Sequence, residues 1–423
     1  MINLMVTWRR FLPNQEAETA NLIDALCPDE SSNSDPAAER PTFYLHVGLH
    51  KTGTTFLQDA LSQSPQLEKE FFFADNLEYL GTCPLGRDPK YVLHGPYNVF
   101  EFHPPGHPYI ELAKNGNFTE YKDDYALTNA FNFLSRVEEL RKEGRNVLMV
   151  YEVFSVSTDR MVERLKQFLS PTWNVKVLVV HRFLHEWLLS NHNQLYRLIA
   201  PDYRSWTKQV KPFDLENPEL EVSQTFDGVE RHSTHVSQLV QRMYQRHFRD
   251  VETVSMDQLA SLQKNGSKGD PLLEYVLCHF VENAPNSCAQ ARLGMINGQD
   301  NNTYQDNTVD LIAQEALAKG FLSKSANRKK VSESIEAEMK LQNVSKLDLP
   351  LICPSNEVLA RFERVSMLAD KNMHGESNWS EEKMSRHKKS FQKLVVGKKF
   401  CHVDAGTVLL MDPWKTFFNR ISL

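Results

Sequence analysis

Short apolar runs alternate with amphipathic stretches along the first two thirds of the chain. Four of these runs are rich in β-branched residues and have the length of buried strands: residues 42–47, 146–151, 175–180 and 251–255. Helical periodicity predicts helices near them, at residues 55–64, 127–142, 159–169, 183–199 and 231–248. Buried strands that alternate with helices predict an α/β fold, in which a central parallel sheet is flanked by helices.

The beginning of the chain differs from this pattern. Residues 28–41 are rich in Ser, Asp, Glu, Ala and Pro, a composition typical of a flexible linker. We therefore expect residues 1–41 to be a flexible N-terminal segment and residues 42–285 to form the α/β domain.

The last part of the chain, residues 286–423, is more polar and has no clear strand pattern before its end. Helices are predicted at residues 333–342 and 356–371, and a small hairpin around Gly406 within residues 400–410. We expect a mostly helical C-terminal extension packed on the core, either separate from the α/β domain or part of it.

The composition of the chain indicates what kind of protein it is and which binding partners it can have. Hydrophobic residues make up 41% of the chain and charged residues 24%, as in ordinary globular proteins. The formal net charge of −6 argues against a nucleic-acid partner, because neutralising phosphates needs a basic surface. A few cations focused in one pocket could still hold a small polyanion.

The cysteines and the hydropathy of the chain indicate in which cellular compartment the protein works. The six cysteines are scattered, without a CxxC pair or Cys/His zinc spacing, so we expect free buried thiols and no metal site. No run of 18 apolar residues predicts a membrane span, and the N-terminus does not resemble a signal peptide, so a cytoplasmic location is the default. A Golgi-lumen enzyme that lacks its N-terminal anchor stays open, since N-x-S/T sequons occur at Asn117, Asn265, Asn301, Asn343 and Asn378.

The loop from Gly48 to Thr55 has the context of a phosphate-binding site, because it follows a strand and opens a helix. Glycines let backbone N–H groups converge, and the helix N-terminus adds partial positive charge. Gly48 and Gly53 have the separation of the ATP-binding pattern G-x-x-x-x-G-K-[ST], but Thr54 occupies the lysine position and the lysine is Lys51. An ATPase or GTPase is disfavoured, also because no strand ends in an Asp suited to Mg²⁺.

The run Lys51-Thr52-Gly53-Thr54-Thr55 resembles the 5′-phosphosulfate loop of the sulfotransferases, which use 3′-phosphoadenosine 5′-phosphosulfate (PAPS). The resemblance implies a three-layer P-loop-like fold and is closest to the types that act on carbohydrates and other hydroxyl acceptors. It implies that Lys51 contacts the phosphosulfate and that Phe56 lies near the adenine. Residues 48 and 51–56 would then form the donor-binding loop.

A second match to this family follows the third strand. Sulfotransferases carry a strand that ends in Arg and, eight residues on, a Ser on the next helix, and both hold the 3′-phosphate of PAPS. Here Arg182 and Ser190 have that spacing. The guanidinium of Arg182 can grip a phosphate with two hydrogen bonds, and Ser190 can reach the same group if the helix lies across the site.

The implied reaction is in-line transfer of a sulfuryl group to a hydroxyl acceptor, with fixed cations such as Lys51 in place of a metal. The base that deprotonates the acceptor is either Glu152, just past the second strand, or His50. A further histidine pool lies in the Pro-rich stretch 91–109, which is either an acceptor-binding lid or a plain connection.

Two alternatives to an active sulfotransferase remain open. One is a P-loop nucleotide-binding kinase or NTPase, and the other is an inactive sulfotransferase-fold binding protein. The glycine-containing C-terminal loop of the family has only a weak candidate, Lys319-Gly320. The acceptor and the oligomeric state do not follow from the sequence.

Overall fold

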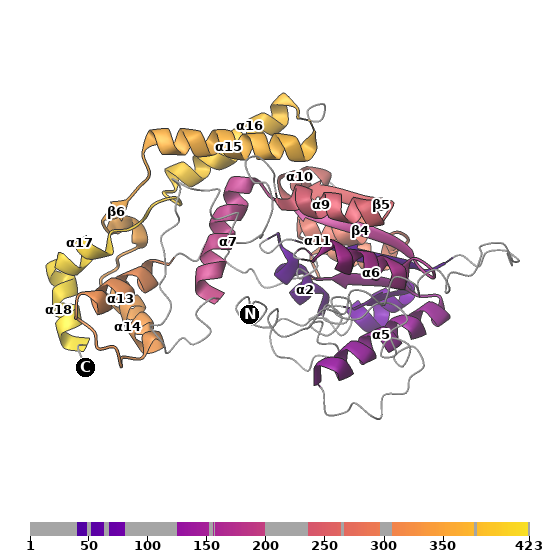
Figure 1. The fold of residues 1–423 in the computed structure, drawn as a ribbon, viewed down its shortest axis with the longest axis horizontal. Helices are drawn as coiled ribbons and strands as arrows, with labels where there is room; N and C mark the ends of the chain where they lie inside the picture. The colour runs from indigo at the N-terminus through magenta and orange to yellow at the C-terminus, as the bar shows by residue number, and fades with distance from the viewer. Residues whose placement is uncertain are drawn as a thin grey trace, which may run out of the picture. The chain divides into compact units, whose positions relative to one another are not determined.

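The structure is a computed structural model that describes residues 40–48, 52–62, 67–80, 125–151, 155, 157–198, 236–263, 266–296, 307–375 and 379–421. Residues 41–423 form one structural unit, and Figure 1 labels its helices and strands. Most of the expected flexible segment, residues 1–41, lies outside the described residues. The proposed domain boundary after residue 285 stays a prediction.

A five-stranded sheet lies at the centre of this unit, in the order β2-β3-β1-β4-β5, and every neighbouring pair is parallel. The strands are β1 (Thr42–His46), β2 (Leu77–Tyr79), β3 (Asn146–Val150), β4 (Asn174–His181) and β5 (Asp250–Ser255). The α/β fold with a central parallel sheet flanked by helices is thus confirmed, as are the four predicted strands. The edge strand β2 was not predicted, because three residues are too few for a recognisable pattern.

The helices around the sheet also follow the sequence pattern closely. They are α2 (Thr54–Ser62), α5 (Tyr125–Glu143), α6 (Asp159–Leu169), α7 (Leu184–Leu198), α9 (Val236–His247), α10 (Met256–Leu262), α11 (Pro271–Tyr275) and α12 (Pro285–Leu293). Two π-helical segments, η1 (Leu67–Phe72) and η4 (Val276–Phe280), complete this part of the chain.

Alternate strand residues face two separate hydrophobic cores, because successive side chains of a strand point to opposite faces. Phe43 and Leu45 of β1 face one core, which the buried sides of α5, α6, α7 and α9 complete. Tyr44 faces the other core, together with residues of α2, α10, α11, η4 and α12. The sheet is therefore covered on both faces.

The C-terminal part contains α13 (Thr308–Ala318), α14 (Arg328–Leu341), η5 (Lys346–Asp348), β6 (Leu351–Ile352), α15 (Asn356–His374), α16 (Glu381–Val396), β7 (His402–Val403), α17 (Ala405–Leu410) and α18 (Asp412–Ile421). The two long helices α15 and α16 contact each other (Figure 1), and α15 also contacts α7. Phe362 and Phe391 belong to the core that α7 shares. Helices α13, α14, α17 and α18 enclose a core of their own.

The predicted hairpin around Gly406 is wrong. Residues 405–410 form helix α17, and β7 pairs with β6 in antiparallel orientation instead. The reason is local: the Asp404 side chain accepts hydrogen bonds from the Thr407 amide at 3.1 Å and the Thr407 hydroxyl at 2.7 Å. This cap at the first turn stabilises a helix where the apolar run alone is compatible with a strand.

The expectation of free cysteine thiols is wrong for four of the six cysteines. Disulfides join Cys278 of η4 to Cys288 of α12 and Cys353 to Cys401. The paired Cα atoms lie 4.7 Å and 4.3 Å apart, although the partners are 10 and 48 residues apart in sequence. Spacing along the chain does not reveal such pairs, because the fold brings the partners together.

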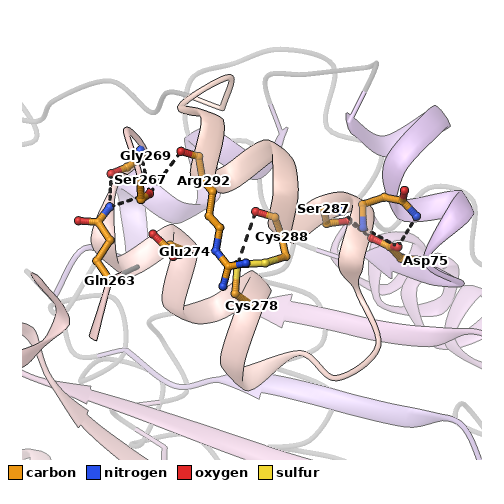
Figure 2. Close-up of a disulfide and its surroundings, with 10 residues drawn as sticks. Asp75, Gln263, Ser267, Gly269, Glu274, Cys278, Ser287, Cys288 and Arg292 are labelled. Atoms are coloured by element: carbon orange, nitrogen blue, oxygen red, sulfur yellow. Dashed lines mark hydrogen bonds and ion pairs between the residues drawn. A yellow bond between two sulfur atoms is a disulfide. The ribbon is translucent and has the colours of Figure 1, made fainter. Parts of the chain in front are cut away.

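Figure 2 shows how the first disulfide is embedded between α12 and its neighbours. At the beginning of α12, the Asp75 carboxylate accepts hydrogen bonds from the amides of Asn286 at 3.1 Å and Ser287 at 2.7 Å. At the other end, Arg292 donates to buried Glu274 of α11 at 3.0 Å. These contacts and the disulfide fasten α12 to the α2 side of the sheet. None of the described helices is both long enough and apolar enough to cross a membrane.

Candidate functional site

Gly48 follows β1 at a position where neighbouring side chains leave no room for a Cβ atom. A Cβ atom at position 48 would lie 2.2 Å from Thr54 Oγ1 and 2.6 Å from the His46 ring, so no larger residue fits without displacement. Gly53 has a φ of +84°, which favours glycine, and a Cβ there would lie 2.5 Å from Leu272 Cδ2. Both glycines of the predicted phosphate loop are therefore required by its geometry.

Two hydroxyl residues of this loop, on either side of Gly53, are buried. Thr52 and Thr54 are 0% and 1% exposed. The Thr54 hydroxyl has no hydrogen-bond partner within the described residues, which is unusual for a buried polar atom. Thr54 begins helix α2, so this hydroxyl lies where the helix leaves its first amides without internal acceptors.

Other predicted residues of the loop are less fully defined. Thr55 lies in the first turn of α2, and Phe56 is partly buried against the core on that face of the sheet. His50 and Lys51 lie outside the described residues, so their predicted roles stay predictions.

Arg182 follows β4 directly, as predicted from the sequence. Its Nε donates to Glu186 Oε2 at 2.7 Å, one turn into α7, and both side chains are largely buried. Ser190 is fully buried further along α7. Glu186 was not singled out in the sequence, although its i, i+4 spacing from Arg182 is the usual spacing of ion pairs on helices.

The connections after β1 and β4 lead to opposite faces of the sheet. The two strands are parallel neighbours, and the Val47 amide donates to the Leu178 carbonyl at 2.8 Å. After β1 the chain enters α2 on one face of the sheet, whereas after β4 it enters α7 on the other face. In open α/β sheets, ligands bind at the carboxyl edge where successive connections leave to opposite faces. The glycine loop and Arg182 flank this position.

The carboxyl end of β3 lies against the same loop. The Tyr151 amide donates to the His46 carbonyl at 3.2 Å, and the Gln58 side chain of α2 donates to the Val150 carbonyl at 3.1 Å. Gln58 thus fixes α2 to the end of β3. Glu152, the first candidate base, follows Tyr151 but lies outside the described residues, as do His94, His103 and His107.

The end of β5 places a further carboxyl group at this edge of the sheet. Burial raises the pKa of Asp257, although a hydrogen bond from the Ser255 hydroxyl and the nearby Arg386 guanidinium act to lower it. The Arg386 Nε lies 3.1 Å from Asp257 Oδ2. Asp257 was not among the predicted site residues, because its sequence context resembles an ordinary helix start.

Lys319 and Gly320, the weak candidate for a further phosphate contact, lie at the end of α13. Lys319 pairs with Glu315 at 3.7 Å, and Gly320 adopts a φ of +79° that ends the helix. Helix α13 belongs to the separate C-terminal core and not to either core of the sheet. The local structure explains this pair as a helix terminus.

Comparisons with known proteins give a distant structural likeness. No family model matches the sequence, and no curated protein is significantly similar to it. A solved sulfotransferase from Alicyclobacillus acidocaldarius is 16% identical over a match that covers 66% of this chain and 95% of that protein, with a TM-score of 0.29. A TM-score this low supports no inference about the site or the reaction, which depend on the residues of this chain.

Proposed function

We propose that this protein is a sulfotransferase that moves a sulfuryl group from PAPS to a hydroxyl acceptor, with carbohydrates as the acceptor class. The observation that carries the proposal is the pairing of the glycine loop after β1 with Arg182 after β4, on adjacent strands whose connections leave to opposite faces. A nucleotide with phosphate groups at the 3′ and 5′ positions of its ribose needs two such anion sites. The order of these sites along the chain matches the order in the family that the sequence resembles.

The described residues fit the donor. Gly48 lies beside the buried Thr54 hydroxyl, and a glycine backbone can approach an anion closely because it carries no side chain. The buried Thr54 hydroxyl lacks a partner within the described chain and can donate to a phosphate oxygen. At the other anion site, the Glu186 carboxylate orients the Arg182 guanidinium through Nε. A guanidinium has further N–H groups with which to hold a phosphate.

In the proposed reaction the acceptor oxygen attacks sulfur in line with the bridging oxygen of the donor. The new S–O bond forms as the bond between sulfur and the phosphate oxygen breaks, and the negative charge moves to the leaving phosphate. Lys51 and the loop amides would stabilise this charge. The acceptor proton passes to Glu152 or His50, and the nucleotide leaves as 3′,5′-adenosine bisphosphate.

Ligand binding tests the donor site first. We expect 3′,5′-adenosine bisphosphate to raise the melting temperature of the full chain, because a ligand at 100 times its Kd stabilises a fold by about 2.7 kcal/mol. ATP with Mg²⁺ should have little effect. Stabilisation by ATP–Mg²⁺ alone would contradict the proposal and favour a P-loop kinase or NTPase.

A turnover assay distinguishes an active sulfotransferase from an inactive binding protein of the same fold. A panel of carbohydrate and phenol acceptors is incubated with sulfur-labelled PAPS, and label transfer is measured for the wild type, Lys51→Ala and Lys142→Ala. Lys142 lies exposed on α5 and serves as the matched control. We expect transfer that Lys51→Ala abolishes and Lys142→Ala preserves. Full activity of Lys51→Ala would refute the mechanism, and bisphosphate binding without any transfer would favour a binding protein.

We also propose that the protein works in an oxidising compartment such as the Golgi lumen. Disulfides persist in such compartments and are rare in the cytosol of most organisms. Two disulfides connect described parts of the chain. Asn343, the sequon residue within the described part, is exposed at the end of α14, where a glycan has room. A glycan at Asn343 would support the proposal, and reduced thiols at all four cysteines in protein isolated from its natural source would contradict it.

A further inference from the structure

Three helices bring a group of polar side chains together in the interior of the protein. His185 comes from the first turn of α7, Asp370 from α15 and His387 from α16. All three are 0% exposed. One nitrogen or oxygen atom of each lies within 4.8 Å of the corresponding atoms of the other two. Two imidazoles and a carboxylate are a common ligand set for zinc and other first-row divalent ions.

We infer that His185, Asp370 and His387 form a structural metal site for a divalent first-row ion, such as Zn²⁺, that fastens α15 and α16 to α7. The site is separate from the proposed donor site and does not depend on the proposed function. The sequence does not predict it, because His185 lies more than 180 residues before Asp370 and His387 and the three ligands come from three helices.

The spacing of the polar atoms suits a tetrahedral ion. Bonds of about 2.0–2.2 Å to nitrogen and oxygen put neighbouring ligand atoms about 3.4 Å apart. His387 Nε2 lies 3.2 Å from Asp370 Oδ2. The Ser366 hydroxyl oxygen occupies a fourth corner, at 2.9 Å from His185 Nδ1, 3.1 Å from His387 Nε2 and 3.5 Å from Asp370 Oδ2. These four separations are each within about 0.5 Å of that spacing.

The hydrogen bonds on the far side of His185 orient its ring for metal binding. Ser390 donates its one hydroxyl hydrogen to Glu186, so its oxygen can only accept from His185 Nε2, at a distance of 3.0 Å. The proton of the neutral ring therefore resides on Nε2, and Nδ1 presents a lone pair to the cluster. Histidine ligands of metals are commonly held in this way, with the second ring nitrogen donating to a fixed partner.

The buried charge of Asp370 favours a cation in the cluster. Within the described residues, its Oδ2 lies 3.2 Å from His387 Nε2 and accepts a hydrogen bond from the Leu184 amide at 3.3 Å. A divalent ion bound by both imidazoles in their neutral form adds positive charge beside this carboxylate.

Aromatic rings enclose the cluster and exclude water from it. Phe183 stacks on His185 and contacts His387 edge-on, with ring centroids 5.5 Å and 5.1 Å apart. Phe391 and Trp379 contact the two imidazoles from other sides. Such a closed, apolar surrounding is typical of a structural site and leaves no open position for a substrate.

Metal analysis of the purified full chain tests the inference. Elemental mass spectrometry should find about one divalent ion per chain, as structural zinc sites hold. The ion should be lost in His387→Gln and kept in His247→Gln. His247 of α9 is the matched control, because its Nε2 contacts Asp159 of α6 at 3.1 Å, outside the cluster. Removal of the ion by a chelator should lower the melting temperature of the wild type and the control by the same amount.

Replacing His387 by another metal-binding residue tests the inference even if His387→Gln does not fold. The wild type is stripped of metal and given Co²⁺, which we expect to produce the intense visible absorption of tetrahedral cobalt. In His387→Cys a thiolate-to-cobalt band should appear in the near ultraviolet. Absence of both a stoichiometric metal and a cobalt spectrum in the wild type would overturn the inference and leave a hydrogen-bonded cluster. Metal content that His387→Gln and His387→Cys leave unchanged would overturn it as well.

Discussion

The Nε of Arg182 donates to Glu186 Oε2 at 2.7 Å, and the other oxygen of the same carboxylate accepts from Ser390 of α16. The arginine that we propose to bind the 3′-phosphate is thus held by α7 and, through one more residue, by the C-terminal extension. An arginine held by a carboxylate has a fixed orientation before the ligand arrives, which lowers the entropy that binding costs.

Replacement of Arg182 should weaken nucleotide binding and leave the fold intact. Hydrogen bonds to charged groups contribute about 1.5–3 kcal/mol each, so Arg182→Ala should raise the Kd for 3′,5′-adenosine bisphosphate by about ten- to a hundredfold. Arg182→Lys should recover only part of this loss, because lysine lacks the planar fork of N–H donors. Isothermal titration calorimetry measures both variants, and Arg160→Ala on α6 is the control. An unchanged Kd for Arg182→Ala would remove this residue from the donor site.

A methyl group at position 48 should disrupt the loop after β1. The added Cβ of Gly48→Ala would lie 2.2 Å from Thr54 Oγ1, so the loop must shift, at a cost of about 1–3 kcal/mol in the free energy of unfolding. We expect bisphosphate binding to be lost as well. Gly144→Ala is the matched control, since this glycine has a φ of +68° and open space around it. It should cost about 1–2 kcal/mol through backbone strain alone and preserve binding.

Denaturant unfolding and calorimetry on the same preparations distinguish these outcomes. Equal bisphosphate affinity in Gly48→Ala and Gly144→Ala would mean that the loop after β1 does not hold the donor.

The sequence pattern predicted most of the sheet, because β1, β3 and β4 contain continuous apolar runs of the kind that a sheet covered on both faces buries. Gly48, Gly53 and Arg182 could be identified for a similar reason. Sharp turns and strand ends have local chemistry that is visible in a few consecutive residues.

What the sequence did not predict depends on contacts between distant segments. The Cys353–Cys401 pair forms because β6 and β7 pair across 48 residues. The cluster around Asp370 joins α7 to two helices far along the chain. The hairpin around Gly406 was predicted from hydrophobicity, yet the cap formed by Asp404 determined the structure.

The two disulfides should make unequal contributions to stability. In the chain-entropy account, closing a loop of the size of Cys278–Cys288 contributes about 3 kcal/mol and one of the size of Cys353–Cys401 about 4 kcal/mol. Replacing each pair by serines should therefore lower the free energy of unfolding more for the second pair. Denaturant titration of the two double variants measures this difference. Peptide mapping without reduction should recover both cross-linked peptides, and free thiols at these four positions would contradict the pairing.

Protonation of His402 should destabilise the protein in mildly acidic solution. Burial lowers the pKa of His402, the positive charge of Lys346 lowers it further, and Asp404 opposes both effects. The unfolded chain, in which a histidine has a pKa near 6.5, therefore binds this proton more readily than the folded chain does. The stability that the neutral imidazole provides is complete above about pH 6.5 and decreases as the pH falls from there toward the lower pKa of the folded state.

The variant His402→Gln isolates this contribution, because glutamine fills a similar volume and does not titrate. We expect the melting temperature of the wild type to fall more steeply than that of the variant between about pH 6.5 and pH 5. In this range a histidine of the unfolded chain binds its proton. His247→Gln is the control for the loss of one imidazole elsewhere in the protein. Because His402 lies in β7, next to Cys401 of the disulfide, the comparison is made with the disulfide intact. Parallel curves for the wild type and His402→Gln would show that other groups cause the acid sensitivity.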